Sequence, residues 1–387
     1  MSVRLLPFEY AVRNLGRNPL RTAAGVAGAA LVVFLVAGAA GFVRGMRRAL
    51  VGAGSPDNVL LLGAGSEESV ERSQLEFRSA AVVAASVRGI RTRLGVPYVS
   101  PEVHLALSVA REPDAPRGRL TVVRGVTRRA FLVHPAVEIT RGRAPTAGNS
   151  ELLVGERLAE ELGVGAGQGT LWLDGKPWQV VGCFSAPGTA LNAELWTPLT
   201  DLQVLAKRDT LSCVVLTLDP ARGELADVEA LAAQRLDLEL TAMRETDYYA
   251  GLDAFYRPVR LLVLLSAALI ALGGVLGGLN VSYATFASRG AELGTLQTLG
   301  FSRGALLLSL VQESLLAHAV GALVACGLAV PLLDGLSIRF SMGAFGLVVD
   351  GPALALALGA GLALGVVGAL PPALRLLRST IPDSLRT

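Results

Sequence analysis

Four long apolar runs constrain this chain more than any other feature of its sequence. They occupy residues 22–43, 261–286, 305–333 and 353–374. A helix that crosses a bilayer needs about 20 apolar residues, so each run is long enough to do so. Of the 387 residues, 52% are hydrophobic and 17% are charged, whereas about 25% are charged in an average soluble domain. The sequence therefore predicts an α-helical membrane protein with four transmembrane helices.

Small residues recur inside the second and fourth runs. The glycines are Gly273, Gly274, Gly277 and Gly278 in the second run, and Gly359, Gly361, Gly365 and Gly368 in the fourth. Small residues at such spacings allow two helix backbones to approach closely in lipid. We therefore expect these helices to pack against one another or against another subunit.

Arginines near the ends of the runs predict the orientation of the chain. One group precedes the first run, one lies between the second and third runs, and one follows the fourth: Arg4, Arg13, Arg17 and Arg21; Arg289 and Arg303; Arg375, Arg378 and Arg386. Basic residues concentrate on the cytoplasmic side, and an even number of spans places all three groups on one side. We therefore expect both termini in the cytoplasm and the protein in the cell (inner) membrane. Arg44, Arg47 and Arg48 oppose this orientation but are outnumbered.

The first run also has a feature of a cleaved signal peptide, because residues 36–40 resemble a cleavage region. The apolar part of a signal peptide is usually roughly 7–15 residues long, and this run is longer, at about 22. About 20 residues also precede it. We therefore expect a retained transmembrane helix that follows a cytoplasmic amphipathic segment at residues 1–21.

Residues 44–256 have the texture of a soluble domain. Strands are predicted at 58–62, 103–109, 120–123, 152–154, 170–173, 178–181, 213–218 and 239–243, and helices at 67–94, 128–134, 156–162 and 224–235. Asp174-Gly175 between two of the strands is a strong hairpin signal. This pattern predicts an extracytoplasmic α+β domain between helices 1 and 2, with a second subdomain inserted at about residues 136–200.

The ends of this domain are predicted to be helical. Segments 43–51 and 246–260 would form a stalk between the domain and the membrane. Four aromatic residues, Tyr248, Tyr249, Phe255 and Tyr256, are expected to mark this stalk and the outer membrane interface, where aromatic side chains are enriched. Residues 334–352 are expected to be an extracytoplasmic loop, and residues 375–387 a cytoplasmic tail.

The segment at residues 287–304 joins the second and third runs on the expected cytoplasmic side. Leu293, Leu296 and Leu299 recur at three-residue spacing and form an apolar stripe, whereas Arg289, Glu292 and Arg303 add charges of both signs. Such a segment offers a surface to a soluble partner. An ordinary interfacial helix buried among lipid headgroups is the alternative interpretation.

Four local patterns, in this order and on this topology, resemble the MacB/FtsX/LolC-type (type VII) permeases of ABC transporters. They are residues 13–21, the pair Gly142-Arg143 with residues 151–155 and 178–182, residues 289–303, and residues 371–378. The resemblance covers essentially the whole chain. It implies that the extracytoplasmic domain is a MacB-like periplasmic core domain and that residues 287–304 are the coupling helix.

The resemblance also implies partners. The coupling helix would contact a cytoplasmic ABC ATPase through Arg289, Glu292, Leu293, Gly294, Leu296, Leu299, Gly300 and Arg303. A second permease copy is expected, as a homodimer or as a heterodimer with a paralogue. A membrane-fusion protein or another extracytoplasmic partner could bind the outer domain. The basic residues are dispersed, which argues against nucleic acid.

The sequence predicts no catalytic site in this chain. A nucleotide-binding P-loop needs a Gly-Lys pair followed by Ser or Thr, but the only such pair, Gly175-Lys176, is followed by Pro177. ATP and Mg²⁺ are therefore expected in a separate ATPase subunit, with no cofactor or metal here. Residues 300–304 match Gly-x-Ser-x-Gly, but that motif requires a strand-to-helix turn with a histidine and an acid beside it.

Two ionisable residues fall inside the third run, Glu313 and His318. Ionisable groups in a membrane are costly and tend to face partners or a pathway. Glu313 also resembles a glutamate common at this place in the family, where it would brace neighbouring helices. A packing role is favoured over substrate contact for both. The cysteines show no metal-type spacing, and Cys183 and Cys213 are either two buried thiols or one disulfide.

The sequence as a whole predicts a permease subunit that works by mechanotransmission. ATP hydrolysis by a separate ATPase would move the coupling helices, the spans and the outer domain, for export or extraction of a hydrophobic or peptide-like cargo. The four runs show no obvious polar tunnel, which favours a cargo handled outside the membrane. Two alternatives stay open: an FtsX-like, ATP-driven regulator of an extracytoplasmic enzyme, and an ATP-independent membrane receptor or scaffold.

Overall fold

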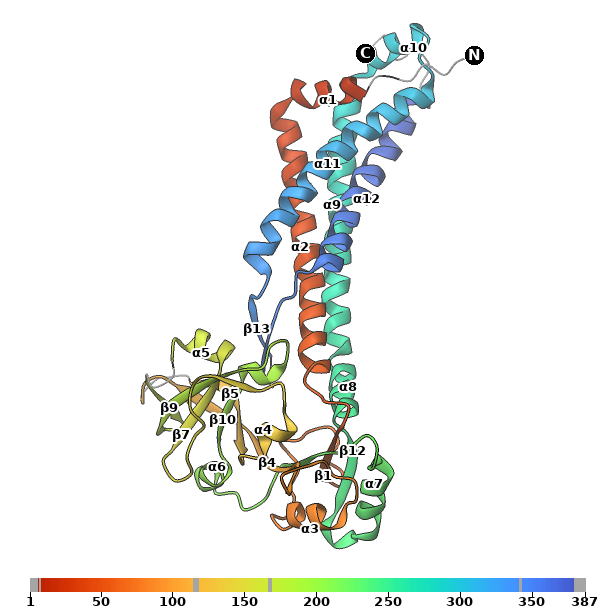
Figure 1. The fold of residues 1–387 in the computed structure, drawn as a ribbon. Helices are drawn as coiled ribbons and strands as arrows, with labels where there is room; N and C mark the ends of the chain where they lie inside the picture. Colours follow the sequence, from red (N-terminus) through yellow and green to blue (C-terminus); the bar gives the residue numbers. More distant parts are fainter. Residues whose placement is uncertain (1–5, 7, 114–117, 166–168, 341–342, 379–387) are drawn as a thin grey trace. The chain divides into compact units, whose positions relative to one another are not determined.

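The computed structural model describes residues 6, 8–113, 118–165, 169–340 and 343–378, and the chain divides into two compact units (Figure 1). The first, here called the helical unit, comprises Met1–Gly45, Pro258–Leu336 and Gly346–Thr387. The second, here called the α+β unit, comprises Met46–Arg257 and Ser337–Phe345. Each unit has a hydrophobic core of its own.

Four long helices make up most of the helical unit: α2 (Pro19–Val51), α9 (Arg257–Ala287), α11 (Arg303–Leu333) and α12 (Gly351–Arg378). Each is long and apolar enough to cross a membrane, which confirms the four predicted runs. Two short helices, α1 (Phe8–Arg17) and α10 (Gly290–Thr298), lie at the same end of the long helices (Figure 1). α2 begins at Pro19, and proline suits the first turn of a helix because it lacks the N–H that would be unsatisfied there.

Small side chains set the packing of α2, α11 and α12. Their common core is rich in alanine and valine, including Val33, Ala37, Ala322, Ala325, Ala329 and Ala357. At Gly321 of α11, a Cβ would lie 2.5 Å from the carbonyl oxygen of Val26 in α2, so only glycine permits this approach. α9 differs, because 6% of its most apolar stretch is buried, against 22–39% in the other three. Most of α9 is therefore available to lipid or to another subunit.

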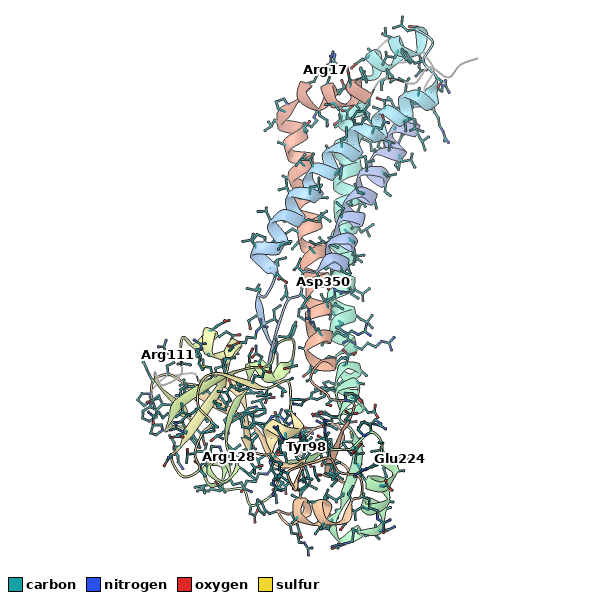
Figure 2. All side chains as sticks on the ribbon, in the orientation of Figure 1. Arg17, Tyr98, Arg111, Arg128, Glu224 and Asp350 are labelled. Atoms are coloured by element: carbon teal, nitrogen blue, oxygen red, sulfur yellow. The ribbon has the colours of Figure 1, made fainter. Side chains whose placement is uncertain are left out.

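One of the three arginines that oppose the predicted orientation has a counter-charge. Arg44 of α2 forms an ion pair with Asp350, which immediately precedes α12 and is labelled in Figure 2. An ion pair lowers the cost of a charge near lipid, so Arg44 weighs less in the orientation than its sequence position suggests.

One continuous sheet forms the centre of the α+β unit, in the order β12-β1-β11-β4-β5-β10-β7-β9-β6, with β8 paired to β4 and β9. The strands are β1 (Asn58–Gly63), β4 (Val99–Ala110), β5 (Arg119–Val126), β6 (Glu138–Gly142), β7 (Glu151–Gly155), β8 (Thr170–Leu173), β9 (Lys176–Ser185), β10 (Leu195–Pro198), β11 (Cys213–Thr217) and β12 (Leu240–Arg244). The pairs β5–β10 and β7–β9 are parallel, and the other pairs are antiparallel.

The strands from residues 138–198 form one end of this sheet, joined to the rest through the pairs β5–β10 and β4–β8. At the other end, β1 and β12 are neighbours, and Val59 lies opposite Arg244. The chain therefore enters and leaves the unit through adjacent strand ends, because β1 follows α2 and β12 precedes α8 (Glu245–Phe255) and α9. Both segments predicted to form a stalk, 43–51 and 246–260, are mostly helical.

Helices of the α+β unit cover the apolar core of the sheet. They are α3 (Ser79–Ser86), α4 (Ala130–Val133), α5 (Glu156–Leu162), α6 (Leu199–Ala206) and α7 (Leu225–Gln234), with short 3₁₀ turns at Ala190–Ala193 and Leu236–Leu238. Two further strand pairs are short, β2 (Thr92–Arg93) with β3 (Val96–Pro97), and β13 (Ser337–Phe340) with β14 (Gly343–Gly346).

One sequence prediction of local structure is wrong, and one expected loop contains regular structure. The helical spacing over 67–94 yields a helix only at α3, because Leu75 exchanges backbone hydrogen bonds of 2.9 and 2.8 Å with the distant Leu211. Bridging to another segment of the chain thus overrides the local periodicity. Residues 334–352, expected to be a loop, contain the strand pair β13–β14, and Ser337–Phe345 belongs to the α+β unit.

Candidate functional site

The segment predicted to be the coupling helix contains the short helix α10, between α9 and α11. Arg289 precedes it, and Gly300 follows it with a φ of +91°, a backbone conformation that favours glycine. The Ser302 hydroxyl then accepts a hydrogen bond from the backbone N–H of Ala305 at 3.2 Å and caps the start of α11. The sequence thus places α10 in a fixed, tightly turned connection.

The predicted leucine stripe is divided between the protein interior and its surface. Leu293 is 3% exposed and packs with Leu306 and Leu310 of α11, and Leu296 is partly buried against the same cluster. Gly294 is also buried. Leu299, by contrast, is 64% exposed. The stripe is therefore not one free face, since its first two leucines hold α10 against α11.

The charged residues of the predicted site contact one another and the N-terminal helix. Arg289 donates to the Glu313 carboxylate at 2.7 Å and to Glu292 at 3.3 Å. Arg17 of α1, labelled in Figure 2, donates to Glu292 at 2.8 Å. The Tyr10 hydroxyl donates to the same Glu292 oxygen at 2.5 Å. These residues, with Asn14, are called the α1–α10 network below.

Glu313 anchors the α1–α10 network to α11. Asn14 of α1 donates to its Oε2 atom at 3.3 Å, and Arg289 donates to the same atom. The Glu313 residue is 8% exposed. One carboxylate thus holds α1, α11 and the start of α10 together, as a bracing role requires.

Mutual attraction stabilises the charged forms in this network. Burial disfavours the charge on Arg289, but the nearby Glu313 carboxylate outweighs it and raises the pKa of Arg289 above its usual value. Burial likewise opposes the charge on Glu292, yet hydrogen bonds from Tyr10 and Arg17 lower the pKa of Glu292. The network therefore keeps its ion pairs near neutral pH.

His318, the second ionisable residue predicted in the third span, makes short-range contacts within α11. Its Nδ1 atom lies 2.9 Å from the Ser314 carbonyl oxygen one turn earlier. The Ser314 hydroxyl donates to the Gly365 carbonyl of α12 at 2.9 Å. This arrangement supports a packing role at the α11–α12 contact.

The outward face of α10 and of the turn after it is a different set from the predicted stripe. Its exposed members are Ala291, Thr295, Thr298, Leu299, Gly300, Ser302, Arg303 and Gly304. Of the eight predicted coupling residues, this face retains Leu299, Gly300 and Arg303. Thr295 and Thr298 were missed, although they lie at the helical spacing opposite the buried Leu293 and could have been found from it.

In the α+β unit, the residues that carry the family resemblance, at 142–143, 151–155 and 178–182, have structural roles. Arg143 forms two hydrogen bonds to Glu151, at 2.7 and 2.6 Å. These bonds from Arg143 and a third from the Thr146 N–H hold the pKa of Glu151 at about 2. A Cβ at Gly182 would lie 2.7 Å from the Arg143 carbonyl oxygen, so this position requires glycine.

A buried charged cluster in the α+β unit was not predicted. Glu102 of β4 is fully buried and accepts hydrogen bonds from Arg124 at 2.8 Å and from His134 at 2.9 Å. Arg124 also donates to both carboxylate oxygens of Glu194, at 2.8 and 2.9 Å. These residues, with His104, are called the Glu102 network below. Its members come from β4, β5, the end of α4 and the residue before β10, so no local pattern signals it.

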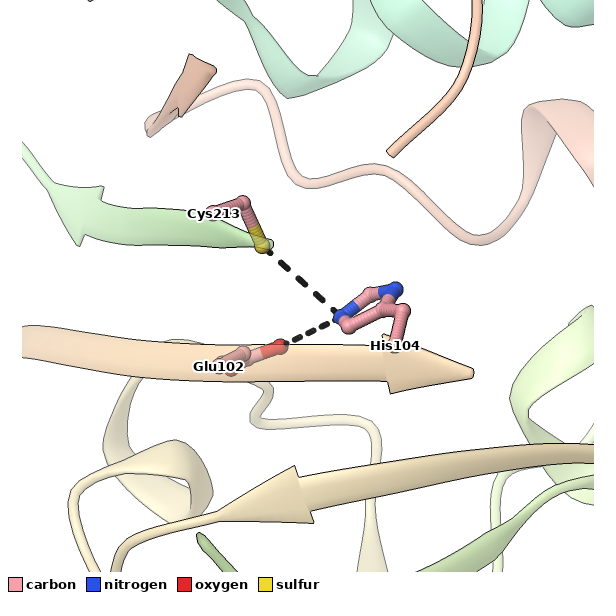
Figure 3. A group of neighbouring side chains, drawn as sticks. All are labelled: Glu102, His104 and Cys213. Carbon is pink, nitrogen blue, oxygen red and sulfur yellow. Dashed lines mark hydrogen bonds and ion pairs between the residues drawn. The ribbon is translucent and has the colours of Figure 1, made fainter. Parts of the chain in front are cut away.

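Figure 3 shows the part of this cluster whose donor atoms suit a soft metal ion: Glu102, His104 and Cys213. His104 Nε2 lies 3.1 Å from the Glu102 carboxylate and 3.8 Å from the Cys213 sulfur. However, Arg124 donates to the same Glu102 oxygen that faces His104. Burial and the Glu102 charge also raise the pKa of the Cys213 thiol well above its usual value. A guanidinium at this oxygen opposes a second cation, so we interpret the cluster as structural.

In the α+β unit, the structure changes one further expectation and decides one alternative that the sequence left open. Tyr248, expected at the membrane interface, is 8% exposed, and its hydroxyl accepts a hydrogen bond from the Val70 N–H. It is therefore a core residue, whereas Phe255 is 73% exposed. Cys183 and Cys213 are both buried, and no disulfide joins them.

Solved structures resemble the chain over about half of its length. The periplasmic region of MacB from Actinobacillus actinomycetemcomitans is 12% identical, with a TM-score of 0.39, covering 52% of this chain and 95% of that one. The extracellular domain of the noncanonic ABC-type transporter YknZ from Gram-positive bacteria is 14% identical, with a TM-score of 0.37, covering 48% and 100%. A domain of a putative permease from Porphyromonas gingivalis is 15% identical, with a TM-score of 0.34, covering 48% and 87%.

The family match concerns the C-terminal part of the chain. Residues 264–381 match the model of the FtsX-like permease C-terminal family, a range that includes α10, α11 and α12. No curated protein matches the chain. The family match confirms the resemblance found in the sequence for this part of the chain, where residues 264–381 are similar to an FtsX-like permease C-terminal domain.

Proposed function

We propose that this chain is the membrane subunit of an ABC transporter that works by mechanotransmission. A separate cytoplasmic ATPase, which binds ATP and Mg²⁺, docks on the outward face of α10. Two permease copies, identical or paralogous, form one transporter in the inner membrane, with both termini in the cytoplasm. The α+β unit is extracytoplasmic and handles a hydrophobic or peptide-like cargo for export or extraction, with a membrane-fusion protein as a further candidate partner.

The observation that carries this proposal is how α10 is attached. Leu293 packs against α11, and Arg289 binds Glu313 of α11 at 2.7 Å. Glu292 receives hydrogen bonds from Tyr10 and Arg17 of α1. A displacement of α10 therefore moves α1 and α11 with it, because both apolar and charged contacts would otherwise break. An interfacial helix resting among lipid headgroups would not need these attachments.

The outward face of α10 has the character of a docking surface. Leu299 gives it an exposed apolar side chain at the end of the helix, and Arg303 lies exposed at the start of α11. An arginine beside an apolar contact is typical of the centre of protein interfaces. The attachments on the inward side and the free residues on the outward side thus divide α10 into a holding face and a docking face.

The test is purification of the tagged full chain from its native membranes in mild detergent, with quantification of any P-loop ATPase that accompanies it. We expect a stoichiometric ATPase with the unmodified chain. Leu299→Asp should lower its recovery by roughly tenfold or more, because docking would bury a carboxylate where the unmodified chain has an apolar side chain. The control is Leu236→Asp in the α+β unit, where Leu236 is 79% exposed.

Recovery of the unmodified chain without any ATPase would contradict the proposal and favour an ATP-independent receptor. Equal ATPase recovery with Leu299→Asp and Leu236→Asp would contradict the assignment of the docking face. Both variants must reach the membrane in normal amount, which immunoblotting of the membrane fraction checks.

A further inference from the structure

A cavity of about 640 Å³ opens in the helical unit, beside the α1–α10 network. α1, α2, α9 and α11 all contribute to its lining. Its volume lies within the range of roughly 300–1,000 Å³ that is usual for small-molecule sites. The cavity has an apolar part and a charged part, and the two together suit one class of ligand.

The apolar part runs between α2 and α9. It is lined there by Gly25, Gly28 and Gly277, with Val32 and Val281 among the larger residues. A Cβ added at any of these three glycines would meet no other atom within 4 Å. The space beside them is therefore empty within this chain, and an acyl chain could lie there against bare helix backbone.

The charged part of the lining contains three arginines and two glutamates: Arg17, Arg21, Arg289, Glu292 and Glu313. Two of the arginines have partners, since Arg17 pairs with Glu292 at 2.8 Å and Arg289 pairs with Glu313 at 2.7 Å. Arg21, in the first turn of α2, is half-buried and forms no ion pair with any described residue. One positive charge in the lining is therefore left for a ligand.

We propose that this cavity binds a phospholipid with a net negative headgroup. The phosphate binds Arg21, and one acyl chain lies along Gly25, Gly28 and Gly277. Basic pockets between transmembrane helices are suited to anionic headgroups, because the fixed charge attracts them at the membrane surface. The apolar space and the single free arginine share one cavity, as the two parts of an amphiphile require. The site does not depend on ATPase docking.

The experiment is native mass spectrometry of the full chain, released from detergent micelles after incubation with a defined additive. The additives are phosphatidylglycerol, phosphatidylcholine and inorganic phosphate, each tested alone. We expect phosphatidylglycerol to be retained about fivefold more strongly than phosphatidylcholine, the advantage that one arginine near the surface confers on an anionic lipid. The same spectra report whether the chain is a monomer or a dimer.

Two pairs of variants test the two parts of the cavity. Arg21→Gln should abolish the preference for phosphatidylglycerol, whereas Arg13→Gln removes a charge from α1 outside the cavity and should preserve it. Gly277→Leu should block the apolar part and reduce retention of both lipids. Gly273→Leu is its control, because Gly273 lies one turn earlier in α9, does not line the cavity and also faces open space.

Three results would overturn the proposal. Equal retention of both lipids by the unmodified chain would identify ordinary surrounding lipid. An Arg21-dependent adduct with inorganic phosphate, and no preference between the lipids, would identify a site for a free anion. A dimer that Gly277→Leu converts to monomer, with lipid retention unchanged, would show that a second copy of the chain occupies the space beside α9.

Discussion

Each unit of this protein contains a charged network, and the two differ in how far water reaches them. In the Glu102 network of the α+β unit, the side chains of Glu102 and Arg124 are 0% and 3% exposed. In the α1–α10 network of the helical unit, Arg289 and Glu313 are 14% and 11% exposed, and Arg17 and Glu292 are 64% and 32% exposed. The Glu102 network is shielded from water, whereas the α1–α10 network is partly exposed at the surface of the helical unit.

The difference suggests different tasks. A fully buried ion pair is expensive to break, because each separated charge would lack both its partner and water. The Glu102 network therefore fixes the strands of the α+β unit in one arrangement. An exposed ion pair contributes little to the free energy of unfolding, and each of its charges easily exchanges its partner for water. The α1–α10 network can thus hold α10 to α11 through Arg289 and Glu313, and α1 to both through Tyr10 and Asn14, while its outer pair, Arg17 with Glu292, rearranges.

The largest effect is expected for Arg124→Met, which leaves Glu102 and Glu194 buried without their common partner. The free energy of unfolding of the α+β unit should fall by about 3–5 kcal/mol. Urea unfolding of the full chain in detergent can measure this, because all three tryptophans (Trp172, Trp178 and Trp196) lie in this unit and report on it.

The matched control for Arg124→Met is Arg235→Met, which removes the exposed pair of Arg235 with Asp237 in the same unit. Its expected effect is much smaller, because an exposed ion pair contributes little to stability. Similar losses in the two variants would show that burial of the Glu102 network contributes nothing extra.

An intermediate effect is expected for Arg289→Gln, which leaves the mostly buried Glu313 with only Asn14 as a donor. The expected loss is about 1–3 kcal/mol, the usual cost of an unsatisfied buried group. The measurement is the midpoint temperature of heat-induced aggregation in detergent. Adding Glu313→Gln should restore part of the loss, since the uncompensated charge then disappears. A double variant that is as unstable as the sum of both single variants would exclude coupling between the two side chains.

A smaller effect is expected for Arg17→Gln in the outer pair, at most about 1 kcal/mol. The same heating experiment applies, with sodium chloride as a second variable. Salt screens exposed charges, so added salt should reduce the difference between Arg17→Gln and the unmodified chain. For Arg289→Gln, the difference should persist in salt. A salt-independent effect at Arg17 would remove the distinction between the outer and inner parts of this network.

The smallest expected effect is on the pH dependence of the α+β unit. Burial lowers the pKa of His134, but the Glu102 charge outweighs it, so its pKa lies above 6.5. The stabilisation of the folded state by His134 is therefore complete below pH 6.5. It is lost as the pH rises through the pKa of His134 in the folded state. Burial, assisted by Arg124, lowers the pKa of His104 below 6.5. The stabilisation from His104 is present above pH 6.5 and is lost as pH falls.

The variants His134→Asn and His104→Asn should thus change the pH profile in opposite directions. His134→Asn should flatten the alkaline side of the curve of unfolding free energy, and His104→Asn should flatten the acid side. Urea unfolding from about pH 5 to about pH 9 brackets the usual range of histidine. Parallel changes in both variants would be inconsistent with the two opposite pKa shifts.

The membrane helices and α10 could be predicted from the sequence because their signals are local. A span is a continuous run of apolar residues, and α10 follows from its place between two spans. The burial of Leu293 could not be predicted, since it depends on Leu306 and Leu310 of α11. A leucine stripe is equally consistent with a docking face and with a packing face.

The Glu102 network could not be predicted for the same kind of reason. Arg124 and Glu194 come to Glu102 only through the pairing of β4 with β5 and of β5 with β10. The sequence shows isolated charges on apolar strands and no motif. The false helix at 67–94 has the same origin, because the Leu75–Leu211 bridge joins segments that are distant in the chain.

The neighbouring positions of β1 and β12 have a mechanical consequence for the α+β unit. Val59 at the start of β1 lies opposite Arg244 at the end of β12, so tension on both connections to the membrane helices reaches the sheet at one corner. If both connections are pulled at the same time and in the same direction, β1 and β12 move as a pair. The hydrogen bonds between β1 and β12 then carry little load. The load falls instead on the hydrogen bonds between β1 and β11. Because the pull acts along the strands, it is a shear that several of these hydrogen bonds share.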